Sequence, residues 1–149
     1  MKIKIYAIAK KQNNHNEFMA YIKQFGVKLE VIDIFNANIQ KAHKTSPNEA
    51  RISYTKEFER FINKNAMNIA LHPNGKIVDS YELSDMMKNS QEVNFFIGGA
   101  FGFEERFLKQ TKPISLSKLT FSHKIVKIIL CEQIFRTLCI INNHPYHRK

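Results

Sequence analysis

A chain of 149 residues, 44% of them hydrophobic, is long enough for one domain with an ordinary core, and we predict a single domain over residues 1–149. No run of roughly 18 apolar residues is present, which excludes a membrane-spanning helix, and the opening MKIKIYAIAKK is interpreted as a strand and not as a signal peptide, so a cytoplasmic location is expected. The chain has 23 basic and 13 acidic residues and a formal net charge of +10, which suits a polyanionic partner.

Short apolar or alternating stretches are predicted to be strands, and helical patterns separate them. In chain order we expect a strand at 2–9, a helix at 14–25, a strand at 27–34, a helix at 46–63, a strand at 68–71, a helix at 80–87, a strand at 93–97, a helix at 104–109, a strand at 114–116 and a helix at 122–141. The polar stretch 43–47 is expected to be mobile. This alternation predicts an α/β domain with a largely parallel sheet and flanking helices.

The last predicted helix, 122–141, is apolar nearly all the way round its axis. It includes Cys131 and Cys139, which are too far apart on one helix to bond each other and are interpreted as buried thiols. A helix without a polar face must be covered on every side. We therefore expect part of it to form an oligomer interface, with a central core helix as the alternative.

The positive charge is concentrated near the C-terminus. From residue 106 onward there are nine basic residues and one acidic residue, Glu132, so this segment contributes eight of the ten net positive charges. A concentrated positive field favours nucleic acid as a partner. Charge that serves only solubility is the alternative, and composition does not decide between the two.

Three loops follow predicted strands, and ligands in open parallel sheets bind beyond such strand ends. They are GGAFG at 98–102, HPNGK at 72–76 and SLSKLTF at 115–121. Glycines allow a backbone to approach a ligand closely, and small hydroxyls near a helix start form a polar cradle. None of the loops matches a dinucleotide fingerprint or a P-loop. Each has a structural alternative, namely a tight turn, an ordinary loop or a helix cap.

The tail NNHPYHRK, residues 142–149, is rich in aromatic, imidazole and cationic groups, a mixture suited to stacking on and pairing with RNA. A frayed basic terminus is the alternative. His144 and His147 are three residues apart, but Pro145 interrupts helical spacing and no cysteine or carboxylate accompanies them. We therefore expect no metal site.

These segments, in this order, resemble one family over the whole chain: the ribosomal RNA large subunit methyltransferase H family of the SPOUT superfamily. The matching residues are FIGGAFG, EFMAYIKQFGVKLEVIDI and, most specifically, SLSKLTFSHKIVKIILCEQIFRTLCIINNHPYHRK. The resemblance implies a trefoil knot near the C-terminus and a homodimer. It also implies methylation of N3 of a pseudouridine in 23S ribosomal RNA, with S-adenosylmethionine as donor and the assembled ribosome as the expected substrate.

The resemblance further implies roles for particular residues. The cofactor is expected to lie against Leu71, Gly98, Gly99, Gly102, Leu116, Ser117, Lys118, Leu119, Thr120 and Phe121. The tail is expected to complete the partner subunit's pocket. Because the N3–H group must lose its proton, His144 and Tyr146 are the candidates for proton handling. Arg148 and Arg136 are the candidates for stabilising the anion or a phosphate. The family often has Asp where this chain has His72.

Two other classes stay open from the residues alone. One is a non-catalytic basic RNA-binding protein of the ribosome, which leaves the three loops without a role. The other is an unrelated α/β enzyme with a nucleotide cofactor, although the chain lacks the fingerprints for NAD and ATP. Binding measurements with S-adenosylmethionine, NAD and ATP separate these possibilities.

Overall fold

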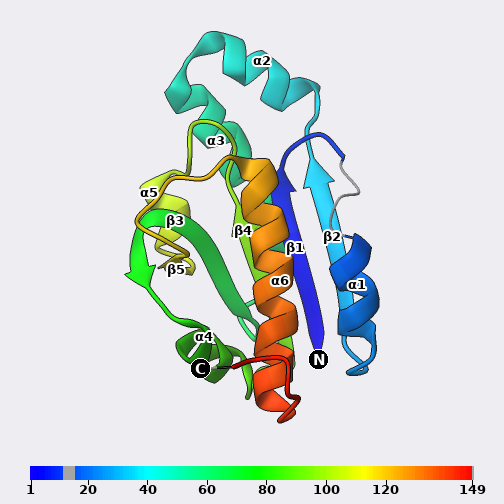
Figure 1. Cartoon of the computed structure of the whole chain (residues 1–149). Coiled ribbons are helices and arrows are strands. Elements are labelled where there is room, and N and C mark those ends of the chain that lie inside the picture. The colour runs from blue at the N-terminus through cyan, green and yellow to red at the C-terminus, as the bar shows by residue number, and fades with distance from the viewer. Residues whose placement is uncertain (12–15, 149) are drawn as a thin grey trace.

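The computed structural model describes residues 1–11 and 16–148, and its centre is a five-stranded parallel sheet (Figure 1). The strands are β1 (Lys2–Ile8), β2 (Lys28–Ile34), β3 (Met67–Ile77), β4 (Glu92–Ile97) and β5 (Lys112–Ser115), arranged in the order β2-β1-β4-β3-β5. The helices are α1 (Asn16–Lys23), α2 (Ala37–Thr45), α3 (Pro47–Phe58) with a following turn η1 (Glu59–Phe61), α4 (Ser80–Met87), α5 (Glu105–Leu108) and α6 (His123–Ile141). The predicted α/β class is confirmed.

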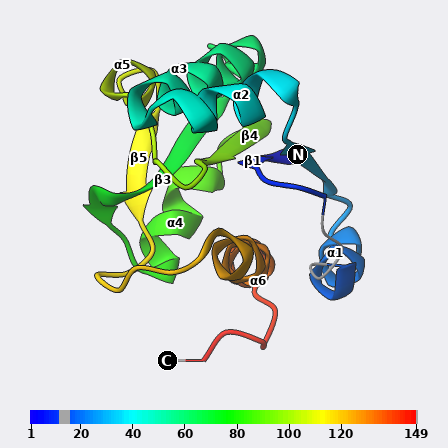
Figure 2. The same ribbon diagram turned by 90° about the horizontal axis from the view of Figure 1, so that it is seen from above.

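Helices cover both faces of the sheet. Seen from above, α2, α3 and α5 lie on one side of the strands and α1, α4 and α6 on the other (Figure 2). Strand residues alternate between the two layers: Ile3 and Ile5 pack in the cluster that contains α6, whereas Tyr6 and Ile8 pack in the cluster that contains α3. The domain therefore has two apolar cores that share one sheet. The trefoil knot implied by the resemblance stays a prediction.

Strand β3 continues beyond Leu71, where the sequence predicts its end. Leu71 and Lys76 both lie opposite Ile114 of β5, so residues 72–75 form an irregularity within the strand. Gly75 makes this possible, because a Cβ at that position would be 2.7 Å from the backbone of Ile114. The turn-forming residues thus bulge out of the strand and do not terminate it.

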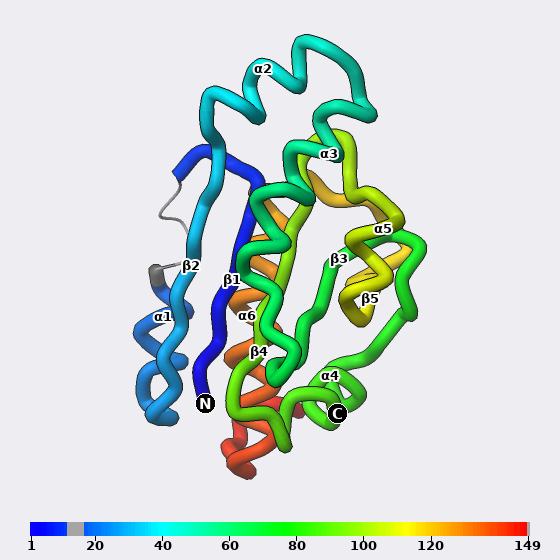
Figure 3. Tube along the Cα trace, turned by 180° about the vertical axis from the view of Figure 1, so that it is seen from behind, coloured from blue at the N-terminus to red at the C-terminus, as the bar shows by residue number. Residues whose placement is uncertain are grey.

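The segment 43–47, predicted to be mobile, is mostly helical. Helix α2 ends at Thr45, and Ser46 caps the next helix by accepting a hydrogen bond from the amide of Glu49 at 3.0 Å. Helix α2 was not predicted from the sequence. Only Ile39 in it is buried, so the segment has no apolar periodicity that indicates a helix. Figure 3 shows α2 and α3 on the face of the sheet opposite α6.

Helix α6 combines the two alternatives left open by its sequence. Leu130, Ile134 and Leu138 are buried against the sheet, as in a core helix, whereas Ile125 is 49% exposed. Lys127, one of the nine basic residues near the C-terminus, is buried and forms an ion pair with Asp33 of β2. It therefore contributes to the fold and not to a surface that attracts polyanions.

No helix in the described residues is long and apolar enough to cross a membrane.

Both cysteines are free and buried in α6, as predicted. Burial raises the pKa of the Cys131 thiol from 9.0 to about 12 and also raises the pKa of Cys139. The fold favours the neutral thiol, so this contribution to stability is complete below pH 9.0 and is lost as the pH rises toward 12. We expect an aromatic disulfide reagent at ~pH 8 to modify the native protein slowly and the urea-unfolded protein rapidly. Equal rates in both states would contradict this picture.

Candidate active site

A cavity of about 360 Å³ opens at the carboxyl edge of the sheet. It is lined by the irregular part of β3, the loop after β4, the loop after β5 and the first turn of α6. Of the ten residues expected to hold a cofactor, all except Lys118 line this cavity. Lys118 is exposed beside it. The three loops singled out in the sequence therefore meet at one place, as the parallel topology requires.

The loop 98–102 needs its glycines for three different reasons. A Cβ on Gly98 would be 2.9 Å from the carbonyl oxygen of Gly102, and a Cβ on Gly99 would be 2.5 Å from the hydroxyl oxygen of Tyr54. Gly102 has a φ of +78°, a conformation that side chains rarely tolerate. Its amide donates to the carbonyl of Gly99 at 3.1 Å and closes the turn. The loop is thus a tight turn and, at the same time, a wall of the cavity.

The loop between β5 and α6 is shaped by its own hydroxyl groups. The Ser115 hydroxyl donates to the carbonyl of Ser117 at 2.8 Å, and the Ser117 hydroxyl accepts from the amide of Leu119 at 3.0 Å. These bonds fold the loop over the cavity and leave Leu119 72% exposed at its rim. The sequence alternative is a helix cap by Ser117, Thr120 or Ser122. Ser122 occupies the cap position of α6, but its side chain makes no cap hydrogen bond to the helix.

Sequence reasoning missed several residues of the cavity wall. Ile97 is the last residue of β4, and His123 and Val126 come from the first turn of α6. Their positions at a strand end and a helix start were the available signal. Phe101, by contrast, belongs to the 98–102 loop that the sequence singled out, and it lines the cavity with 36% of its surface exposed. His72 lines it too, and its Nδ1 accepts from the amide of Asn74 at 3.1 Å.

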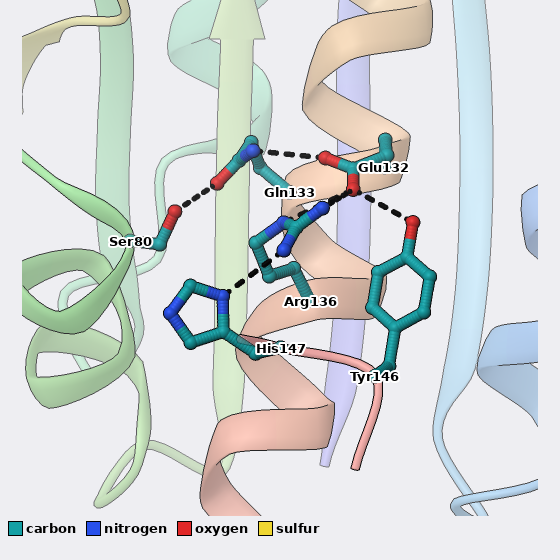
Figure 4. A network of polar contacts seen from close by, with 6 residues as sticks. All are labelled: Ser80, Glu132, Gln133, Arg136, Tyr146 and His147. Atoms are coloured by element: carbon teal, nitrogen blue, oxygen red, sulfur yellow. Dashed lines mark hydrogen bonds and ion pairs between the residues drawn. The ribbon is translucent and has the colours of Figure 1, made fainter. Parts of the chain in front are cut away.

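The C-terminal tail folds back on α6 through the carboxylate of Glu132 (Figure 4). The Tyr146 hydroxyl donates to Glu132 at 3.0 Å, and Arg136 donates to the same oxygen through Nε at 3.1 Å and a terminal nitrogen at 2.7 Å. The Arg136 guanidinium also lies 4.8 Å from the Tyr146 ring, and it is 3.0 Å from Nδ1 of His147. Two polar side chains of α6, Glu132 and Arg136, therefore hold the tail against the helix.

These contacts raise the pKa values of two side chains, Tyr146 in the tail and Arg136 in α6. Desolvation is the largest cause that raises the pKa of the Tyr146 phenol, and the hydrogen bond to Glu132 raises it further. The hydrogen bond with Glu132 raises the pKa of Arg136. Tyr146 is thus a neutral hydrogen-bond donor here, and a role as proton acceptor requires it to leave Glu132.

The tail leaves α6 at the end opposite the cavity, and its Tyr146 hydroxyl reaches back only to Glu132, at the middle of the helix. This helix has 19 residues and is about 28 Å long. Its first turn borders the cavity, whereas the tail follows its last turn (Figure 1). His144 and Arg148 are exposed, and His144 packs beside Phe25 with ring centroids 5.9 Å apart. A single chain therefore does not bring His144, Tyr146, Arg148 or Arg136 to its own cavity.

A glycine-walled cavity at the carboxyl edge of a parallel sheet is typical of an α/β enzyme with a small-molecule cofactor. The profile of a family described as "Predicted SPOUT methyltransferase" matches residues 1–147, and the chain belongs to this family. It is similar to the ribosomal RNA large subunit methyltransferase H of Helicobacter acinonychis (strain Sheeba), with 47% identity covering 99% of this chain and 100% of that protein. The corresponding proteins of Helicobacter pylori (strain Shi470) and Wolinella succinogenes are 46% and 44% identical over 99% of this chain.

SPOUT methyltransferases use S-adenosylmethionine, and the cavity suits such a ligand. Its volume, about 360 Å³, is within the range of small-molecule sites. Leu71, Leu116 and Phe121 offer apolar contact for a base, and the glycine loop lets backbone groups approach a polar ligand closely. Within the described part of the chain no three His, Cys, Asp or Glu side chains are grouped to hold a metal ion.

Proposed function

We propose that this protein methylates N3 of a pseudouridine in the RNA of the large ribosomal subunit. The observation that carries the proposal is the cavity formed by the three loops in a chain whose whole length matches methyltransferases named for large-subunit ribosomal RNA. The remaining basic surface suits a ribosomal substrate, because RNA binding depends on contacts with phosphates. A non-catalytic RNA-binding protein would have no use for the cavity.

Methyl transfer to N3 requires the chain to orient the methyl donor and to deal with the proton on N3. S-adenosylmethionine supplies an electrophilic methyl group, and the cavity loops orient it toward the acceptor. The acceptor N3–H is nearly neutral at physiological pH, so a side chain must take its proton or stabilise the anion. His144 and Tyr146 are proposed for the proton, and Arg148 and Arg136 for the anion or a phosphate. Correct placement of the two substrates supplies a large part of the rate.

We further propose that the active unit is a homodimer built on α6. The half-buried side of this helix, together with Ile125, leaves apolar surface that a second copy would cover. An antiparallel partner would bring its tail from the far end of its own α6 to this cavity. The separation of tail and cavity within one chain supports this arrangement. Sedimentation equilibrium tests it, and a monomer at micromolar concentration would argue against it.

The enzymatic proposal is tested by transfer of tritiated methyl groups from S-adenosylmethionine to ribosomes from a strain that lacks this gene, with free ribosomal RNA assayed in parallel. We expect label in one fragment of the large-subunit RNA, and stronger label with ribosomes than with free RNA. Cofactor binding without label would move the substrate elsewhere. RNA binding without cofactor binding would favour the non-catalytic alternative.

Mixed dimers test whether the tail acts on the partner's cavity. Tyr146→Phe and His144→Ala are each prepared, and the variant that removes the proton-handling group is expected to lose about 100-fold or more in turnover. When that tail variant is mixed with a cavity variant, activity should return only if a tail serves the other subunit's cavity. Normal turnover of both tail variants would show that neither residue handles the proton.

A further inference from the structure

Phe101 has two environments. Phe101 lines the cavity, and its ring also meets the ring of His43 in α2 edge-on, with centroids 5.2 Å apart. Its backbone carbonyl accepts a hydrogen bond from Arg51 of α3 at 3.3 Å. The cavity loop is therefore connected to α2 and α3, which contribute no residue to the cavity lining.

Tyr54 of α3 is the centre of this connection. Its side chain is 1% exposed, and its hydroxyl oxygen is 2.5 Å from Nε2 of His43. Burial raises the pKa of this phenol, and a backbone hydrogen bond from Phe101 opposes the rise. The phenol and the His43 imidazole are within hydrogen-bond distance, so they pair across the gap between α3 and α2. One phenol thus joins the loop backbone to α2.

The same phenol fixes the loop sterically. The place of a Cβ on Gly99 is 2.5 Å from the Tyr54 hydroxyl oxygen and 2.6 Å from Cζ, so the loop backbone lies directly on the ring. The ring itself cannot move away easily, because it is buried in the cluster that contains Ile39 and Phe58. His43 packs against Tyr54 with ring centroids 5.6 Å apart and also against Phe35 at 5.8 Å. Loop, phenol and imidazole form one continuous contact.

We propose that Tyr54 and His43 are positioning residues, which hold the 98–102 loop and the Phe101 ring in the shape that binds S-adenosylmethionine. The inference rests on the proposed function in so far as the cavity is the cofactor site. Neither residue touches the cavity, so they act through the loop. Loss of their hydrogen bond frees Phe101 to fill part of the cavity and to compete with the cofactor.

The test compares S-adenosylmethionine affinity, measured by calorimetry on the full chain, with thermal stability. Tyr54→Phe and His43→Ala are expected to weaken binding roughly three- to tenfold. His43→Gln should stay near the wild-type affinity, since a side-chain amide can still pair with the phenol. The double variant Tyr54→Phe/His43→Ala should be no weaker than the worse single variant, because both remove the same bond. In the ribosome assay the KM for the cofactor should rise while kcat changes less than about twofold.

Tyr6→Phe is the matched control. Tyr6 is a buried tyrosine of the same apolar cluster, 3% exposed, and its ring stacks on Phe61 and Phe96 and not on Phe101 or His43. It should leave cofactor affinity unchanged. Equal weakening by Tyr6→Phe, or unchanged affinity in Tyr54→Phe and His43→Ala, would overturn the positioning role alone. Failure of the wild-type chain to bind S-adenosylmethionine would overturn the cofactor site itself, and loss of methyl transfer with intact binding would overturn only the RNA substrate.

Discussion

Replacement of Gly99 by alanine is expected to weaken S-adenosylmethionine binding roughly 10- to 100-fold and to reduce methyl transfer by a similar factor. The added methyl group would lie 2.5 Å from the Tyr54 hydroxyl oxygen and 2.9 Å from Cγ2 of Ile8. Both neighbours are buried and packed, so the loop must move instead. We also expect a loss of about 1–3 kcal/mol in the free energy of unfolding. Calorimetry and urea unfolding measure the two effects.

Gly26→Ala is the control for this substitution. Gly26 also has a positive φ, +71°, but a Cβ there would meet nothing within 4 Å, and the residue lies between α1 and β2, away from the cavity. It should cost about 1 kcal/mol in stability through the backbone conformation alone and leave cofactor affinity at the wild-type value. A Gly99→Ala protein that binds the cofactor normally would show that the loop does not depend on its contact with Tyr54.

Substitution of Lys127 by methionine should destabilise the domain by about 3–5 kcal/mol, a large part of the stability of a typical domain. The side chains of Lys127 and Asp33 are only 1% and 5% exposed. Methionine fills a similar volume but removes the ammonium group that forms an ion pair with the buried Asp33 carboxylate. Urea unfolding followed by circular dichroism measures the loss.

Two further variants identify the cause of that loss. Lys124→Met, an exposed position on the same helix, should change stability by less than about 0.5 kcal/mol. Adding Asp33→Asn to Lys127→Met removes the buried negative charge that has lost its lysine and should recover part of the lost stability. Wild-type stability in the Lys127→Met protein would mean that the buried ion pair contributes nothing to the fold.

The sequence predicted the sheet and most of the cavity because both depend on local patterns. Short apolar runs marked each strand, and the parallel topology then required the loops after them to meet at one edge. The glycine loop at 98–102 combined a strand end with residues that permit close approach. The resemblance added the identity of the cofactor, which no spacing in the chain specifies.

The features that the sequence did not predict depend on contacts between distant segments. Lysine is a residue type usually found at the surface, so the sequence gives no sign that Lys127 is buried. Its burial depends on the ion pair with Asp33, which lies 94 residues earlier in the chain. The contact of Phe101 with His43 likewise joins segments far apart in the chain. A turn is the usual structure for the sequence Pro73-Asn74-Gly75. Strand β3 nevertheless resumes at Lys76, because Lys76 and Ile77 pair with β5.

The two edge strands of the sheet determine how native molecules can meet. Strand β5 has only four residues, and it includes Pro113, which has no N–H group to offer a neighbouring strand, beside the charged Lys112. Strand β2, at the other edge, carries an ion pair between Lys28 and Glu30 at 3.1 Å. Both edges are thereby poor templates for a strand from another molecule. These features disfavour the extension of the sheet into fibres, and they leave the helical faces as the surfaces on which the proposed dimer would form.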